Sequence, residues 1–574
     1  MRKIPSIWVT LIILYLFICG IRIWYSLAFA GPMNLGDATL YDSIARSIVS
    51  GTFIASGAYG ALVPPGYPLL LSISYLFGPD KIIIYHAQLI LNTLVVGLVL
   101  FPAYWFLRDW CTKEVAVVGA VLVATLPSLS RTTGLIMSEN LFIPLSIFAF
   151  YFIYKAFKTD NPYIGLIAGL FSFSIFFTRS TGIAIFIALV CGFMWYCYQK
   201  QKSGIPVIET IRKKWGILAG AFIPLVIWEG LLIKTGHAAV GYGQDVMIAS
   251  YVGNMGTNFI EYFKISFLQL DYVLLASYII GTVIALYTIF LILQRTEEIT
   301  SVLKKNQNNK DKYEEKTFAL NGITGFAVPF LTISALAPLP LITSEVPYMY
   351  GRYYDPVIPI LFLFTILGIQ YFVAKRTIPQ RAIYGLFLTN IIAAILITLT
   401  LSWNSHFDIL QNATLSYLLN IPSPLESVLI ILLFGIIIPI ILFVGLKYKN
   451  VMRSFFLLLI LMNIIISIPM IQNEVTFSHN FDGVGSVGKY IHSNIEEEAV
   501  IFFDNSSTDP FWGSVYYALI DYWITNDLNS VNLKDITLSE DFTPLQGGDY
   551  IITALPGSTE AIYTSKVGLS LYHL

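Results

Sequence analysis

The chain has 574 residues, of which 56% are hydrophobic and only 12% are charged, and its mean hydropathy is +0.71. This composition excludes a soluble globule and predicts a polytopic membrane protein. The formal net charge is −1 and the sequence has no long block of lysine or arginine, so nucleic acid is not expected as a partner.

About thirteen apolar segments meet the length that a bilayer core demands, which is roughly 20 residues per helix. The first runs from Ile7 to Phe29 and is preceded by Arg2 and Lys3. It is longer than the apolar region of a signal peptide, which has ~7–15 residues, so a retained anchor is predicted. The predicted spans begin near Ile7, Ile83, Val115, Asn140, Pro162, Thr181, Trp215, Tyr272, Ala319, Pro356, Ala382, Glu426 and Ser454.

Basic residues are distributed unevenly between the alternate loops. With the N-terminus inside, the inner loops hold 23 lysines and arginines and the outer loops hold 7. Because basic residues accumulate on the cytoplasmic side, we expect a multi-pass cell-membrane protein with a cytoplasmic N-terminus and an extracytoplasmic C-terminus. The count requires that residues 66–78 do not cross the membrane, and a segment of about 12 residues is better suited to an interfacial helix.

Residues 30–82 then form one external loop, and residues 234–271 form a second. In the first loop an amphipathic helix is predicted on the membrane surface, because apolar residues recur every fourth position at Leu40, Ile44 and Ile48. Asp42 and Arg46 are expected on the opposite side of that helix as an i,i+4 pair.

Five charged residues project to the outer membrane face in this topology: Asp37, Arg22, Glu139, Arg179 and Arg352. Each has a structural interpretation, because Asp37 is placed to cap the N-terminus of its helix and the others are placed at helix ends. Ionisable residues at a lipid boundary are nevertheless costly and usually functional. Two acids and three arginines at one leaflet therefore favour a site that acts on a molecule held in the membrane.

The motifs around these residues resemble the GT-C superfamily of glycosyltransferases, in the branch of the protein O-mannosyltransferases and lipid A aminoarabinose transferase. The similar blocks are Arg22, Gly36–Arg46, Gly51, Pro64–Pro68, Ser138–Phe142, Thr178–Gly182 and Gly351–Tyr354 with Pro356 and Pro359. The resemblance covers residues 7–470. It implies a GT-C-like transmembrane catalytic domain over residues 1–471, including the loop 30–82.

The resemblance implies transfer of a single sugar from a polyprenyl-phosphate donor, with Asp37 as the catalytic carboxylate of the first loop. An acceptor hydroxyl on a protein, lipid or glycan needs a general base to accept its proton, and Asp37 is expected to be that base. Direct displacement of the phosphate is expected to invert the anomeric carbon. Family members often carry Asp-Glu here, whereas this chain has Asp37-Ala38. That departure argues against a divalent metal at this pair. A divalent cation, Mg or Mn, stays open for the protein as a whole, and no metal ligands are assigned.

Arginine suits the leaving phosphate because its planar fork pairs with two oxygens and stays charged. Arg179 and Arg352 are the expected phosphate ligands, and Arg22 is either a third or a partner for an acid. Glu139 either orients the acceptor or pairs with an arginine. The tyrosines expected to flank the sugar, which have an ordinary interfacial role as their alternative, are Tyr41, Tyr67 and Tyr353.

Residues 472–574 change in composition, and a small extracytoplasmic α/β domain is predicted there. A short amphipathic helix at 484–491, strands at 499–503 and 550–553 and a helix at 512–523 are expected. We expect this domain to cover the cleft or to receive the acceptor. Two other functions stay open: a lipid or glycan transporter or flippase that performs no transfer, and a noncatalytic scaffold.

Overall fold

The computed structural model describes residues 7–32, 35–51, 63–234, 259–278, 280–294, 328–336, 351–375, 449–495, 500–504, 522–523, 532–536, 550–553, 561–565 and 569–573, with isolated positions at 299, 302, 384–385, 388–389, 392 and 520. The chain folds into two compact units. The bundle unit comprises Met1–Cys19, Val95–Arg131 and Ser138–Met470, and the loop unit comprises Gly20–Leu94, Thr132–Met137 and Ile471–Leu574. The predicted division into residues 1–471 and 472–574 stays a prediction.

Seven helices in the described ranges are long and apolar enough to cross a membrane. They coincide with the predicted spans near Ile7, Ile83, Asn140, Thr181, Trp215, Pro356 and Ser454, so the multi-pass prediction is confirmed. They are α1 (Ile7–Ser26), α4 with α5 (Lys81–Gly97 and Leu100–Arg108), α8 (Glu139–Lys158), η2 with α10 (Ser180–Gly182 and Ile183–Lys202), α12 (Trp215–Lys234), α19 (Val357–Lys375) and residues 455–476 of α23 (Lys449–Asn494).

Other predicted spans differ in the structure. The segments near Val115 and Pro162 form shorter helices, α6 (Lys113–Ala124) and α9 (Pro162–Thr178). Of the segment near Ala319, the structure describes only α18 (Val328–Leu336). The spans near Ala382 and Glu426 fall almost entirely outside the described residues.

The single span predicted from Tyr272 is replaced by two helices, α14 (Phe259–Ala276) and α15 (Ile280–Gln294), bent by 96°. Tyr278 lies at the bend with a φ of 56°, a left-handed conformation that is uncommon for a residue with a side chain. Because α14 begins at Phe259, the end of the predicted second loop is helical instead.

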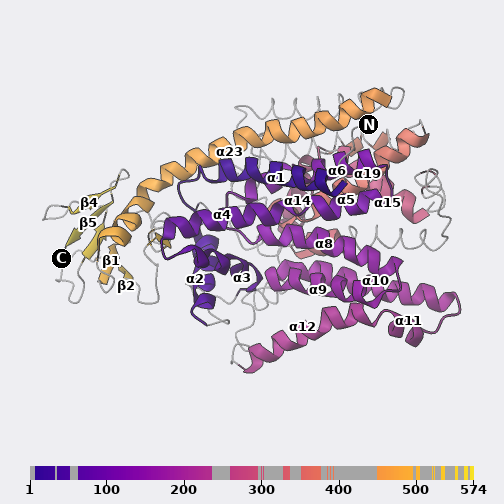
Figure 1. Ribbon diagram of the computed structural model, residues 1–574, viewed down its shortest axis with the longest axis horizontal. Coiled ribbons are helices and arrows are strands. Elements are labelled where there is room, and N and C mark those ends of the chain that lie inside the picture. Colours follow the sequence, from indigo (N-terminus) through magenta and orange to yellow (C-terminus); the bar gives the residue numbers. More distant parts are fainter. Residues whose placement is uncertain are drawn as a thin grey trace. The chain divides into compact units, whose positions relative to one another are not determined.

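The core of the bundle unit surrounds α19, along which Leu361, Phe364 and Leu367 are fully buried. The Phe364 ring packs edge-on against Phe106 of α5 and Phe150 of α8. Helix α9 (Figure 1) packs closely against α12. Both helices carry glycines at four-residue spacing where they meet, a pattern that lets helix backbones approach. A Cβ added at Gly216 would lie 2.0 Å from the Pro162 carbonyl oxygen.

In the loop unit, α2 (Leu35–Val49) matches the predicted amphipathic helix, with Ile44 buried as its spacing indicates. It is followed by Gly51, whose φ of 92° is left-handed. The predicted interfacial segment forms α3 (Gly66–Ser72) and η1 (Ile73–Phe77), which together are too short to cross a membrane.

Among the described residues the longest helix is α23 (Figure 1), which has 46 residues and runs on from the last span to Asn494. The short helix predicted at 484–491 is therefore the end of α23 and not a separate element. A five-stranded sheet follows, in the order β2-β1-β3-β5-β4. Its strands are β1 (Val500–Asp504), β2 (Asn532–Ile536), β3 (Tyr550–Thr553), β4 (Tyr563–Thr564) and β5 (Ser570–His573).

The predicted strands are β1 and β3, which pair in parallel with Phe502 opposite Ile551. Ile501, Phe502 and Phe503 are all buried, as expected of a parallel strand covered on both faces. Strand β2 pairs in parallel with β1, whereas β5 runs antiparallel to β3 and to β4. Of the helix predicted at 512–523, the structure describes Ile520, Tyr522 and Trp523, and all three are helical.

Candidate functional site

Glu139, Arg179 and Arg352 meet in the bundle unit. Glu139 is 1% exposed, and its carboxylate forms an ion pair with the Arg179 guanidinium. The Nε atom of Arg352 lies 3.9 Å from Oε1 of the same carboxylate. Arg179 also donates through Nη1 to the Ser138 hydroxyl at 3.2 Å. Of the two roles open for Glu139, pairing with an arginine is the one that these contacts support.

Helix ends position the three residues. Glu139 is the first residue of α8, where the helix dipole favours a carboxylate. Arg179 adopts an extended conformation directly after α9, so the chain turns there before η2. Arg352 lies in η6 (Gly351–Tyr353), just before α19. The sequence thus brings three distant helix ends to one place.

Tyr353 contacts both arginines of this cluster. Its ring centroid lies 5.2 Å from the Arg179 guanidinium carbon and 6.0 Å from that of Arg352. A cation near an aromatic face is attracted by the ring quadrupole, so Tyr353 helps to hold the two guanidinium groups.

Two further charged residues belong to the cluster and were not expected from the sequence. Asp355 is buried and accepts a hydrogen bond from the Tyr272 hydroxyl at 2.5 Å. Gly351 makes room for Tyr272, because a Cβ there would lie 2.0 Å from that ring. Arg131, from α7 (Pro127–Thr132), is also buried and interacts electrostatically with Asp355.

Burial raises the pKa of Asp355 to about 7. The negative charge of Glu139 acts in the same direction, whereas the hydrogen bond from Tyr272 and the charges of Arg131 and Arg179 oppose it. The cluster therefore contains three arginines and two acids. Glu139 is ion-paired, and Asp355 keeps its proton up to near-neutral pH. The cluster carries an excess of positive charge and is suited to an anion.

A divalent cation does not fit the described residues. Among them no group of three His, Cys, Asp or Glu side chains is arranged to hold a metal ion. The ion-pair partners of Glu139 are the arginines Arg179 and Arg352, which repel a cation. We therefore derive no step that passes through a metal.

The remaining expected site residues lie in the loop unit. Asp37 is half-buried in the first turn of α2, where its carboxylate also faces the favourable end of the helix dipole. Arg22 is buried near the end of α1. Tyr67 is fully buried and donates to Oδ1 of Asn92 at 3.1 Å, while its ring packs edge-on against Tyr41 at 5.1 Å. Tyr41 is half-buried and is the more accessible of the two rings.

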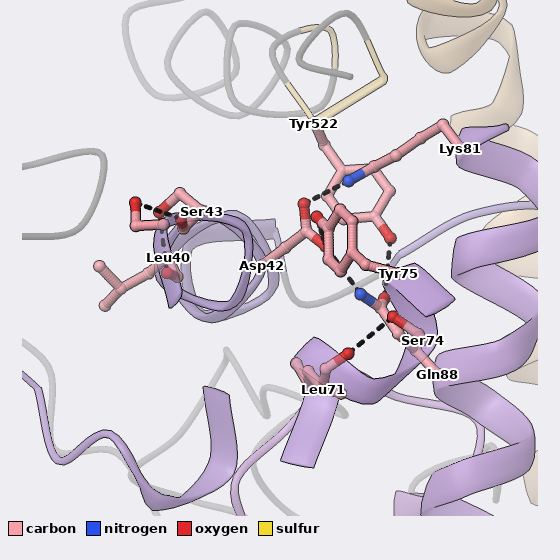
Figure 2. Close-up of polar contacts among 10 residues, drawn as sticks. Leu40, Asp42, Ser43, Leu71, Ser74, Tyr75, Lys81, Gln88 and Tyr522 are labelled. Carbon is pink, nitrogen blue, oxygen red and sulfur yellow. Dashed lines mark hydrogen bonds and ion pairs between the residues drawn. The ribbon is translucent and has the colours of Figure 1, made fainter. Parts of the chain in front are cut away.

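Asp42 differs from its expected place on an exposed helix side. It is 2% exposed, and its carboxylate pairs with the buried ammonium of Lys81 (Figure 2). Gln88 Nε2 and the Tyr75 hydroxyl also donate to Oδ1 of Asp42, at 2.7 and 2.9 Å. These three partners lie 33 to 46 positions after Asp42 in the sequence. The i,i+4 spacing between Asp42 and Arg46 therefore gives no indication of them.

Comparison with known proteins gives structural neighbours only. Neither a protein-family model nor a curated protein matches the chain. The structure is similar to ArnT from Cupriavidus metallidurans bound to undecaprenyl phosphate, with 12% identity over 91% of this chain and 89% of that one and a TM-score of 0.49. The apo state of that protein gives 12% identity, 93% and 87% coverage and a TM-score of 0.47.

A third neighbour is the arabinosyltransferase EmbB from Mycobacterium smegmatis, with 11% identity over 76% of this chain and 41% of that one and a TM-score of 0.35. The likeness concerns the path of the chain alone.

Proposed function

We propose that this membrane protein transfers a single sugar from a polyprenyl-phosphate donor to an acceptor hydroxyl at the extracytoplasmic face. The observation that carries the proposal is the partly buried cluster in which Arg131, Arg179 and Arg352 outnumber Glu139 and Asp355. Its excess positive charge lies at the ends of apolar helices, a position suited to a phosphate whose lipid tail stays in the bilayer.

Arg179 and Arg352 are the proposed ligands of the donor phosphate. As the bond from the sugar to the phosphate breaks, negative charge develops on the leaving group, and fixed guanidinium groups stabilise it. Glu139 holds both arginines in place, and Tyr353 supports them from the ring face. Arg131 and Arg22 add positive charge or hold an acid in position.

Asp37 is the proposed general base. It accepts the proton of the acceptor hydroxyl, whose oxygen forms the new bond to the anomeric carbon as the polyprenyl phosphate leaves. Such proton transfer typically contributes ~10²–10⁴-fold to the rate. Attack opposite the departing phosphate gives inversion at the anomeric carbon. Tyr41 and Tyr353 are proposed to flank the sugar, with Tyr67 supporting Tyr41.

The test is an assay of the purified full-length protein with a panel of polyprenyl-phosphate sugars. Release of free polyprenyl phosphate is measured with and without EDTA. Release from at least one donor, undiminished by EDTA, is expected. No release from any donor would refute the proposal, and movement of the intact lipid across proteoliposomes in the same preparations would establish a transporter or flippase instead.

A further inference from the structure

A buried ion pair fixes the middle of helix α2. Lys81 is 0% exposed and Asp42 is 2% exposed, so both charges are removed from water. Burying two charges costs more free energy than an exposed pair, and removal of either partner leaves an uncompensated charge. Lys81 is the first residue of α4 and Asp42 lies in α2, so this pair holds the two helices in one relative position.

Tyr522 closes the network from the far end of the chain. Its hydroxyl donates to Oε1 of Gln88 at 3.2 Å, while Nε2 of the same amide donates to Asp42. The Lys81 ammonium also lies 4.2 Å from the centroid of the Tyr522 ring (Figure 2). Asp42 is thus held by side chains from η1, α4 and the C-terminal region.

The same C-terminal region also holds the chain as it enters α2. The Ala30 backbone amide donates to the Ser478 hydroxyl at 3.2 Å, and Nζ of Lys489 donates to the Ala30 carbonyl at 3.1 Å. That ammonium lies 4.5 Å from the Trp523 ring. A Cβ added at Gly31 would lie 3.2 Å from the same indole, so a larger residue would press against it.

Asp37 lies between these two attachments. It is five residues before Asp42, which in an α-helix is a rise of about 7.5 Å and a rotation of about 140°. A helix that is held at Asp42, and whose preceding segment is held at Ala30, is restricted in sliding and rotation. The part of α2 that carries Asp37 is therefore held by contacts at other positions of the chain.

We infer that Asp42, Lys81, Gln88 and Tyr522 are positioning residues for Asp37, and that the C-terminal region bearing Tyr522 and Trp523 is a structural part of the first loop. This inference rests on the proposed function in one respect, the role of Asp37 as base. It gives residues 472–574 a structural role besides the expected ones of covering the cleft or receiving the acceptor. The attachment itself is measurable without any turnover.

The test uses the full-length protein and the variants Lys81→Met and Tyr522→Phe. Hydrogen–deuterium exchange of residues 35–51 reports the attachment of α2, and kcat and KM for the donor report its consequence. For Lys81→Met we expect exchange in α2 to rise about tenfold or more, since a buried charged hydrogen bond is lost. The kcat should fall about tenfold or more while KM stays within about threefold, because the arginines of the bundle unit are unchanged.

Tyr522→Phe keeps the ring and removes one hydroxyl, so it preserves folding if Lys81→Met does not. A rise of about threefold in α2 exchange is expected for it. The double variant Asp42→Asn with Lys81→Met should lose no more kcat than Lys81→Met alone, because the two residues act as one unit. The control Lys213→Met breaks the exposed pair with Glu209 and should leave every readout unchanged.

Unchanged α2 exchange in both Lys81→Met and Tyr522→Phe would overturn the inference, whatever their activity. A raised KM with an unchanged kcat would overturn it as well. If the wild-type protein transfers sugar from no donor, the proposed function fails, but the exchange data still decide whether the C-terminal region holds α2.

Discussion

Glu139 lies at the centre of the charged cluster of the bundle unit, here called the bundle cluster. It pairs with Arg179 and lies within 4 Å of Arg352, so both arginines keep one orientation before any phosphate binds. Preorganised charge of this kind costs no reorganisation when negative charge develops on a leaving group. The geometry of each guanidinium therefore matters as much as its charge.

Arg179→Lys tests this at a single residue. Lysine keeps the positive charge but lacks the planar fork, and it cannot serve Glu139, Ser138 and a phosphate together. We expect kcat/KM for the donor to fall by about 10–100-fold, the loss that one or two charged hydrogen bonds produce. The exposed residue Arg212, changed to Lys, is the matched control. Equal activity in both variants would remove Arg179 from phosphate binding.

Asp355 predicts a pH dependence of stability. Its pKa is raised by burial to about 7 in the folded protein, against about 3.9 in an unfolded chain. The folded state thus binds the proton more tightly, and this stabilisation is fully present below about pH 4 and lost as the pH rises through about 7. The unfolding temperature of the wild type should fall more steeply between pH 5 and 7 than that of Asp355→Asn. Identical slopes would contradict this account, and Glu209→Gln should retain the wild-type slope.

Sequence reasoning identifies part of this cluster and misses the rest for a physical reason. Glu139, Arg179 and Arg352 are recognisable because each is a charge at the end of an apolar helix, and the three lie together in the structure. Asp355 and Arg131 give no such signal, because an acid before a helix and a basic residue in a short loop are ordinary features. Their importance comes from burial beside one another, which only the fold reveals.

Helix α23 shows a similar limit for a whole element. The composition changes near Gln472, so a sequence reading ends the span there, yet the helical hydrogen bonding continues to Asn494. The amphipathic repeat of α2 and the apolar runs of β1 and β3 are local signals, and these elements are predicted correctly. No proline near Tyr278 indicates the bend in the sequence. The bend depends on packing, which the local sequence does not show.

One polar residue of α23 supports that bend. Asn463 is fully buried, and its amide donates to the Leu122 carbonyl at 3.1 Å and accepts from the Tyr278 hydroxyl. Asn463→Leu should lower the free energy of unfolding by about 1–3 kcal/mol, because the Tyr278 hydroxyl is left buried without this acceptor. Unfolding in detergent measures it, with Met462→Leu as the control. A cost below that of the control would show that Asn463 does not support the bend.

The whole molecule is a multi-pass membrane protein whose orientation is predicted from its basic residues. Two exposed serines mark opposite sides in that prediction: Ser50 in the first external loop and Ser203 in a basic inner loop. With the exposed Cys191 changed to Ser, Ser50→Cys should react with a membrane-impermeant maleimide in intact cells. Ser203→Cys should react only after permeabilisation. The opposite pattern would invert the topology and place the proposed site on the wrong side.

At this scale the two units have separate tasks in the proposed reaction. The bundle unit contributes the arginines that receive the phosphate, and the loop unit contributes the base and the contacts that hold it. A defect in either should stop transfer, but only defects in the bundle cluster should weaken donor binding strongly.

The most direct test of the account compares polyprenyl phosphate release by the wild-type protein and by Asp37→Asn, with the donor identified in the panel. Asp80→Asn is the matched control, since Asp80 caps α4 in the same loop and asparagine caps equally well. The account predicts a loss of ~10²–10⁴-fold in Asp37→Asn with an unchanged unfolding temperature, and wild-type release in the control. Turnover by Asp37→Asn at the wild-type rate would contradict it.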